Sequence, residues 1–209
     1  MKYIVVAPVG SDLQPLFTGI KEFPTERVIL LTPTERRELA DLAKQELQKF
    51  NIPVQIVPIE LGNYYETIFA AVSEIRKAEG ENLLINVATG DPNLRCAATS
   101  AAFVNGIRAF AADAEGAMLL PILKFSYYKM LTEKKLSLLR ILNEGTASLD
   151  QLSKQSGMSL PLLSYHLHGN PKSAGLKELG LVDLAETKGR VQVTLSTMGR
   201  LLIKGYVSP

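Results

Sequence analysis

Short apolar runs, separated by polar turns and amphipathic stretches, mark the first part of the chain. These runs predict buried strands at Tyr3–Val9, Arg27–Leu31, Val54–Ile59, Leu83–Val87 and Arg108–Ala112, with Ala117–Leu123 paired to the last as a hairpin. Strands that are apolar throughout and alternate with helices are typical of a parallel sheet covered on both faces. The pattern therefore predicts an α/β fold, a Rossmann-like three-layer domain with a mainly parallel sheet and the strand order 3-2-1-4-5.

Three helices are expected between these strands. The first is predicted to start at Thr32–Glu35, with Thr32 as the N-cap, a proline in the first helical position and a glutamate that completes a capping box. Apolar residues at helical spacing predict a second helix over Tyr64–Ile75. The third begins at Asp91-Pro92 and ends at Asn105-Gly106.

The remaining residues have the pattern of a winged helix-turn-helix. Helices are expected over Thr132–Asn143, over Ser148–Ser156 and from Ser159 onward, with Leu160, Leu163 and Leu167 on the buried side of the third. A hairpin over Asp183–Val193, with its tip at Lys188-Gly189, and a closing helix over Thr197–Lys204 follow. We therefore expect two domains, at residues 1–126 and 127–209, with the junction at Phe125–Lys129.

The charge of the chain is unevenly distributed between these parts. From Met130 onward there are 10 lysines and arginines against 6 carboxylates, a net charge of +4, whereas the rest of the chain has a net charge of −2. A basic module on a mildly acidic one fits a phosphate-backbone partner for the C-terminal part only.

Several classes of protein are excluded by the composition. No apolar run approaches the roughly 18–20 residues that cross a bilayer, and the N-terminus lacks a small-residue cleavage site, so we expect a cytoplasmic protein with no membrane contact. Cys96 is the single cysteine, which excludes an internal disulfide and a cysteine zinc cluster. His166 and His168 are spaced i, i+2 without a third ligand nearby, so no metal site is expected.

The predicted strand order reverses between the first and fourth strands, and ligands of such sheets bind at the carboxyl ends of the strands there. The loops at this point are Gly10–Asp12 and Ala88–Arg95. The second loop leads into a helix N-terminus, which favours an anion, and it offers a hydroxyl, an amide and a guanidinium. The alternative is a simple strand-to-helix turn with Asp91 as the N-cap. Neither GxGxxG nor GxxxxGK[ST] occurs, which argues against NAD or ATP, and no cofactor is expected.

The stretch NVATGDPNLRCAATSAAF, at residues 86–103, resembles the strand-four motif of CARF domains, the CRISPR-associated Rossmann folds. The phrase SYHLHGNPKSAGLKELGLV resembles the S-x-HL…L-x-x-x-GLV pattern of ArsR-type and MarR-type winged helices, with Gly169–Lys172 as extra residues before a continuing helix. Together the two parts resemble the archaeal CRISPR-associated CARF–winged-helix transcription regulators.

This resemblance implies a homodimer that binds a cyclic oligoadenylate, typically cyclic tetra-adenylate, in a symmetric cleft between two CARF domains. The family pattern has Thr-Gly-Gly where this chain has Thr-Gly-Asp, so Asp91 would repel a phosphate unless it turns inward to cap the helix. The ligand residues implied by the resemblance are Gly10, Ser11, Asp12, Asn86, Thr89, Gly90, Asn93 and Arg95.

Contact with double-stranded DNA is expected from the third helix in the major groove and from the wing. That helix has no lysine or arginine, so base readout should be modest and affinity should rest on phosphate contacts. Two other functions stay open: a ring nuclease that uses Ser11 and Arg95 on the same ligand, and a winged-helix module for protein contact. The expected DNA residues are Ser159, Ser164, Tyr165, His166, His168, Lys188 and Arg190.

Overall fold

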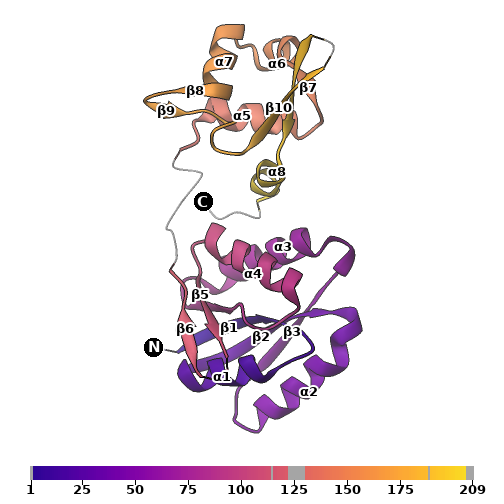
Figure 1. Ribbon diagram of the computed structural model, residues 1–209, viewed down its shortest axis with the longest axis vertical. Helices are drawn as coiled ribbons and strands as arrows, with labels where there is room; N and C mark the ends of the chain where they lie inside the picture. The colour runs from indigo at the N-terminus through magenta and orange to yellow at the C-terminus, as the bar shows by residue number, and fades with distance from the viewer. Residues whose placement is uncertain (1, 114, 122–129, 188, 206–209) are drawn as a thin grey trace. The chain divides into compact units, whose positions relative to one another are not determined.

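A computed structural model describes residues 2–113, 115–121, 130–187 and 189–205, which separate into two compact units. Unit 1 contains β1 to β6 and unit 2 contains α5 to α8 (Figure 1). The predicted junction at Phe125–Lys129 and the boundary between residues 126 and 127 lie outside the described residues.

Unit 1 is built on a six-stranded sheet of order β3-β2-β1-β4-β5-β6. The first five strands are parallel and β6 pairs antiparallel with β5, so the predicted order and the predicted hairpin are confirmed. The strands are β1 (Tyr3–Pro8), β2 (Thr25–Pro33), β3 (Val54–Ile59), β4 (Leu83–Asn86), β5 (Arg108–Ala112) and β6 (Ala117–Leu119). Strand β6 ends earlier than predicted, and residues 122 and 123 lie outside the described part.

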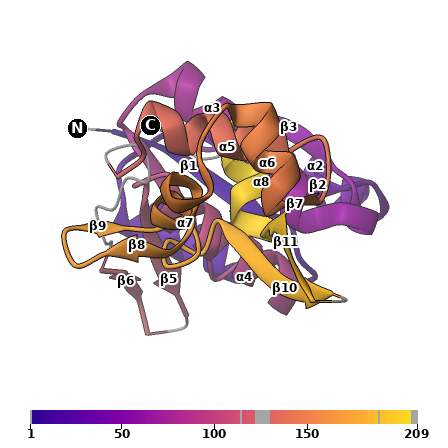
Figure 2. The same cartoon turned by 90° about the horizontal axis from the view of Figure 1, so that it is seen from above.

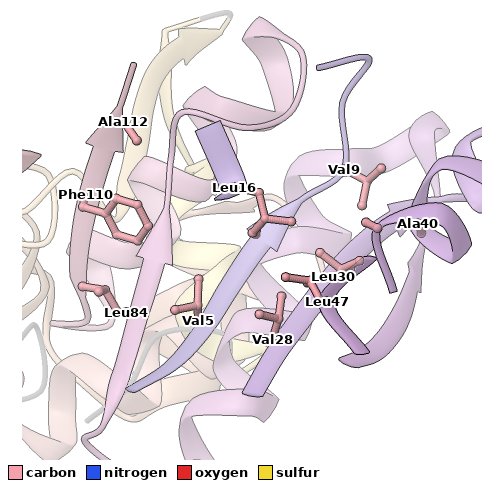
Figure 3. Packing of buried hydrophobic residues seen from close by; sticks show 12 residues of the cluster. Val5, Val9, Leu16, Val28, Leu30, Ala40, Leu47, Leu84, Phe110 and Ala112 are labelled. Carbon is pink, nitrogen blue, oxygen red and sulfur yellow. The ribbon is translucent and has the colours of Figure 1, made fainter. Parts of the chain in front are cut away.

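Helices cover both faces of this sheet, α1 and α2 on one side and α3 and α4 on the other (Figure 1). Side chains of a strand alternate between the two faces, so Val5 and Ala7 face the first pair while Val6 faces the second. Figure 3 shows the core on the α1–α2 side, where Phe110 and Leu16 belong to the same buried cluster as Val5. The helices are α1 (Gln14–Glu22), α2 (Arg37–Gln48), α3 (Tyr64–Glu79) and α4 (Pro92–Val104), with short 3-10 turns η1 (Thr34–Arg36) and η2 (Leu61–Asn63).

Helices α3 and α4 confirm the prediction, but the predicted start of α2 is wrong. Strand β2 continues through Pro33, because Thr32 and Pro33 stay in register with Pro58 and Ile59 of β3. The hydroxyl of Thr32 donates to the Leu30 carbonyl instead of capping a helix. Helix α1 was not predicted at all.

Unit 2 is a winged helix-turn-helix, as predicted (Figure 2). Helices α5, α6 and α7 precede an antiparallel ribbon, β10–β11, to which β7 adds a third strand. The elements are α5 (Glu133–Leu142), β7 (Ala147–Ser148), α6 (Leu149–Ser156), α7 (Leu160–His168), β8 (Gly169–Asn170), β9 (Ser173–Ala174), β10 (Val182–Thr187), β11 (Arg190–Leu195) and α8 (Thr197–Ile203).

Local capping explains where the helices of unit 2 begin. Thr132 Oγ1 accepts from the Lys135 amide at the start of α5, and Ser148 and Gln151 form a capping box at the start of α6. Gly157 has a φ of 68°, in the left-handed region that glycine adopts without strain, and it turns the chain from α6 into α7. These residues fix where α5 and α6 begin and where α6 ends.

Two details of α7 differ from the prediction. Its buried stripe contains Leu163, His166 and Leu167, whereas Leu160 in the first turn is 46% exposed. No helix continues after the extra residues; instead, a small hairpin, β8–β9, follows α7 directly.

Within the described ranges, none of the helices combines the length and apolar character that a membrane span requires. In the same part of the chain, no three His, Cys, Asp or Glu side chains gather closely enough to hold a metal ion.

Candidate functional site

The loops that follow β1 and β4 touch at the carboxyl edge of the sheet. A Cβ atom added to Gly10 would lie 2.7 Å from the Cα of Gly90, so the two backbones meet at these glycines. Gly90 has a φ of 90°, and a Cβ there would press on Pro8 and Leu94. The fold thus brings the two predicted ligand loops, after β1 and after β4, together at the point where the strand order reverses.

Asp91 is the N-cap of α4. Its Oδ1 accepts from the Leu94 amide at 3.0 Å, and its Oδ2 lies 3.3 Å from Nη2 of Arg36. The carboxylate is therefore turned toward its own helix and is neutralised by a guanidinium. The departure from the family's Thr-Gly-Gly pattern does not leave an unpaired negative charge at the helix N-terminus.

Arg36, which was not among the predicted site residues, links three elements. Its Nη1 donates to the carbonyl of Val9 at 3.0 Å, while its Nη2 holds Asp91. The signal for it was available, because Arg36 follows the second strand and strand β2 is the neighbour of β1. The carboxyl ends of adjacent parallel strands place such residues at one edge of the sheet.

Thr89 and Asn86 are both buried, but their side chains differ in what they bond. The Asn86 amide donates to the Pro15 carbonyl and accepts from the Ala88 amide, so it fixes α1 against β4. Since Asn86 is also fully buried, the structure gives it a role in the fold, and its role toward a ligand stays a prediction. The hydroxyl of Thr89, only 1% exposed, has no hydrogen-bond partner among the described residues.

Three other predicted residues are exposed at the same edge. The side chains of Ser11, Asn93 and Arg95 make no hydrogen bond or ion pair with any part of the chain that the structure describes. Asp12 is also exposed, but its Oδ1 accepts from the Gln14 amide and so helps to start α1. An anion at this edge would therefore meet a free guanidinium, a hydroxyl and an amide.

Two tyrosines at the start of α3 extend this edge. The rings of Tyr64 and Tyr65 lie 4.7 Å apart between centroids, and Tyr65 is 44% exposed. Desolvation raises the pKa of Tyr64, as do the neighbouring Tyr65 and the negative charge of Asp91. The Tyr64 phenol therefore remains protonated and can donate a hydrogen bond at neutral pH.

The predicted DNA residues of unit 2 fall into three groups. Ser159, Ser164, Tyr165, His168 and Arg190 are exposed. Lys188 lies outside the described residues. His166, in contrast, is buried.

His166 faces the core, where it is 5% exposed and both ring nitrogens lack a hydrogen-bond partner within the described ranges. Burial lowers the pKa of His166, and the positive charges of Lys135 and Lys134 lower it further. The ring is thus neutral at neutral pH, and because it is buried it is not available to contact a base edge.

Comparison with known sequences identifies one matching family. The family model described as "HFX_2341_N:-like, N-terminal" matches residues 3–117, which extend from β1 into β6. No curated protein matches the chain.

Solved structures with a similar fold include protein VC1899 from Vibrio cholerae, 15% identical over 97% of this chain and 64% of that one, with a TM-score of 0.53. Another is Csm6 from Enterococcus italicus bound to cyclic hexa-2'-fluoro-hexa-dAMP, 14% identical over 78% of this chain and 52% of that one, with a TM-score of 0.50. HlyU from Vibrio cholerae is 29% identical over 37% of this chain and 76% of that one, with a TM-score of 0.32.

The chain thus spans less than two thirds of VC1899 and about half of Csm6. The expected fold, a Rossmann-like α/β domain with a mainly parallel sheet joined to a winged helix-turn-helix, is confirmed.

Proposed function

The chain belongs to the HFX_2341_N:-like, N-terminal family, and we propose that it is a CRISPR-associated transcription regulator that binds DNA as a homodimer under the control of a cyclic oligoadenylate. The ligand would occupy the carboxyl edge of the sheet in unit 1, between two copies of the chain. Unit 2 would hold the DNA. Cyclic tetra-adenylate is the form that the family resemblance favours.

The observation that carries this proposal is the unpartnered hydroxyl of Thr89. A buried hydroxyl without a hydrogen bond is destabilising by about 1–3 kcal/mol, so such a group is retained where a ligand satisfies it. Thr89 lies next to Gly90 and the N-terminus of α4, whose dipole favours a phosphate. Csm6, which shares this fold, is described as bound to a cyclic hexanucleotide analogue.

The charges at the edge support an anionic ligand. Asp91 is engaged by Arg36 and by the Leu94 amide, so its charge is already paired. Arg95, one turn further along α4, has no such partner among the described residues and can place two donors on a phosphate. Since the exposed Asp12 carboxylate lies on the loop after β1, the proposal rests on these donors and not on a net positive charge.

Control of DNA binding requires the ligand to distinguish two arrangements of the dimer. A cyclic ligand with twofold symmetry would contact the same loops of both copies and favour one spacing of the two winged helices. Half-sites on DNA lie about one duplex turn apart, so a change in this spacing changes affinity. We also propose a cytoplasmic location, where both DNA and a nucleotide messenger would be accessible.

The ligand claim is tested by calorimetric titration of the full chain with cyclic tetra-adenylate. We expect Arg95→Ala to weaken binding about 10–100-fold, because a hydrogen bond to a charged group contributes about 1.5–3 kcal/mol. Arg37→Ala is the matched control: Arg37 is exposed on α2 and, among the described residues, pairs only with Asp41. No binding by the wild type at about 50 µM ligand would refute the proposal.

Thr89→Val separates a ligand role from a structural one. The substitution removes a hydroxyl that bonds nothing in the described chain, so the unliganded variant should be at least as stable as the wild type. Affinity for the cyclic ligand should fall about 5–10-fold. A variant that loses stability but binds normally would show that the hydroxyl serves the fold.

Incubation of the full chain with cyclic tetra-adenylate tests the ring-nuclease alternative, for which Ser11 and Arg95 remain the candidate residues. Linear products separated by chromatography would assign cleavage to the chain, and unchanged cyclic ligand would exclude it. Failure of the full chain to retard duplex DNA at low salt would favour the third alternative, a module for protein contact.

A further inference from the structure

The hairpin β8–β9 is inserted into the end of α7. In a continuing helix the carbonyls of His166 and Leu167 would accept from residues 170 and 171, four positions later. Here they accept from the amides of Leu176 and Lys177, six residues further on. The chain therefore leaves the helix, forms a hairpin, and returns to the same carbonyls.

A buried ammonium holds this hairpin in place. Lys135 of α5 is 2% exposed, and its Nζ donates to the carbonyl of Ala174 at 2.6 Å and to Oγ of Ser173 at 3.2 Å. Burying a lysine is costly unless its donors are satisfied, and here the hairpin satisfies them. The hairpin is thus built into the packing of α5 rather than attached to the surface.

Glycines and a short turn complete the rigid geometry. A Cβ at Gly169 or at Gly175 would overlap the backbone of the other arm, so the two arms approach as closely as backbone allows. At the tip, Oδ1 of Asn170 accepts from the Lys172 amide at 2.9 Å, and Pro171 between them has a fixed φ. The tip residues are exposed but ordered by these contacts.

The chemistry of this region suits a polyanion. Residues 151–177 contain Lys154, Lys172 and Lys177 and no carboxylate at all. The exposed tip presents Lys172 and Asn170, which are a cation and an amide, and no large apolar side chain. An apolar protein partner would find little to bury there, whereas a phosphate would meet the ammonium of Lys172 and the amide group of Asn170.

The hairpin β8–β9 and the ribbon β10–β11 lie on different sides of α7. In both views the hairpin β8–β9 and the ribbon β10–β11 extend to opposite sides of α7 (Figures 1 and 2). The ribbon is the wing, and Arg190 on it is exposed. If α7 lies in a major groove of DNA, the hairpin β8–β9 and the ribbon β10–β11 each extend from α7 toward the phosphate backbone, on opposite sides of the groove.

We propose that β8–β9 is a second wing, which places Lys172 on a DNA phosphate at the opposite side of α7 from β10–β11. The inference rests on the proposed DNA binding by unit 2. Part of the affinity for DNA would then come from β8–β9, in addition to the recognition helix and the ribbon. The contact is with the backbone, so it is independent of base sequence.

The test is the salt dependence of binding to a fluorescein-labelled duplex of about 30 base pairs of random sequence, measured by anisotropy. For Lys172→Ala we expect a slope of log Kd against log salt lower by about 0.9 per subunit, and binding weaker by about 3–10-fold. Lys21→Ala is the matched control, because it removes the same charge from an exposed position on α1. Circular dichroism and Tm verify that both variants are folded.

The outcomes separate this inference from the proposed function. Wild type that binds the duplex, together with Lys172→Ala that keeps the same slope and affinity, overturns the second wing and leaves DNA binding in place. Wild type that does not bind at about 20 mM salt overturns both. A Lys172→Ala effect on dimerisation in sedimentation without a change in slope would assign the hairpin to a protein contact and also overturn the inference.

Discussion

Substitution of Asp91 tests how this chain accommodates a carboxylate at the helix N-terminus of its candidate ligand site. The two carboxylate oxygens have separate roles: Oδ1 accepts from the Leu94 amide and Oδ2 pairs with Arg36. Asp91→Asn keeps an acceptor for the amide but removes the charge. Asp91→Ala removes both interactions, so the two variants separate the cap from the ion pair.

The magnitudes follow from the exposure of the two side chains. The pair with Arg36 is partly screened, with 25% and 34% of the side chains exposed, and together with the charge–dipole interaction it contributes about 1 kcal/mol. The N-cap hydrogen bond contributes about 1 kcal/mol more. We therefore expect Asp91→Asn to lower the free energy of unfolding by about 1 kcal/mol and Asp91→Ala by about 2 kcal/mol.

The assay is urea denaturation followed by circular dichroism, with hydrogen exchange of the α4 peptide to assign the change to unit 1. Asp41 provides the control, because its carboxylate also pairs with an arginine, Arg37, at 3.1 Å but does not cap a helix. Asp41→Ala should change stability by no more than about 0.5 kcal/mol. Equal losses for Asp91→Ala and Asp41→Ala would refute the capping role, and equal losses for Asp91→Asn and Asp91→Ala would refute the division between cap and charge.

Three further predictions concern the packing of both units. Gly10→Ala places a Cβ 2.7 Å from backbone and should lower the free energy of unfolding by about 1–3 kcal/mol in urea denaturation, whereas Gly62→Ala, which meets nothing within 4 Å, should not destabilise the chain. The fold lowers the pKa of His166, so the unfolded chain binds the proton at a higher pH than the folded chain does. Thermal unfolding measured as a function of pH should therefore show that unit 2 loses stability as the pH falls below about 6.5. His166→Phe should reduce this loss, whereas the control His168→Ala should retain it. Lys135→Met should speed amide exchange in the β8–β9 hairpin, and exchange as slow as in the wild type would contradict its anchoring role.

The strands of unit 1 were predictable because each is apolar along its whole length, but α1 was not. Helix α1 has nine residues, and one of them is Gly19, which lowers helix propensity. The glycine is there because the ring of Phe110 occupies the space where a Cβ would be. That ring comes from β5, so the reason for the helix lies in tertiary packing that local sequence does not reveal.

The end of α7 likewise could not be predicted correctly from a sequence motif. The S-x-HL…L-x-x-x-GLV pattern predicted a continuing helix after the extra residues, and the structure has a hairpin instead. The motif nevertheless keeps its bonds, because Leu176 and Lys177 reach the carbonyls of His166 and Leu167. His166 was predicted to contact DNA because helical spacing alone does not distinguish a buried imidazole from an exposed one.

For the candidate ligand site, sequence placed both loops correctly but left the meaning of Asp91 open. A carboxylate in a phosphate site and a carboxylate that caps a helix have the same sequence context, and the distinction depends on Arg36, which is 55 positions away. Arg36 can hold Asp91 because the end of β2 lies beside the end of β1, where Val9 anchors the same guanidinium. The strand order thus supplies the countercharge. It follows that a chain of this fold with aspartate at this position should need a basic residue after its second strand, as Arg36 is here.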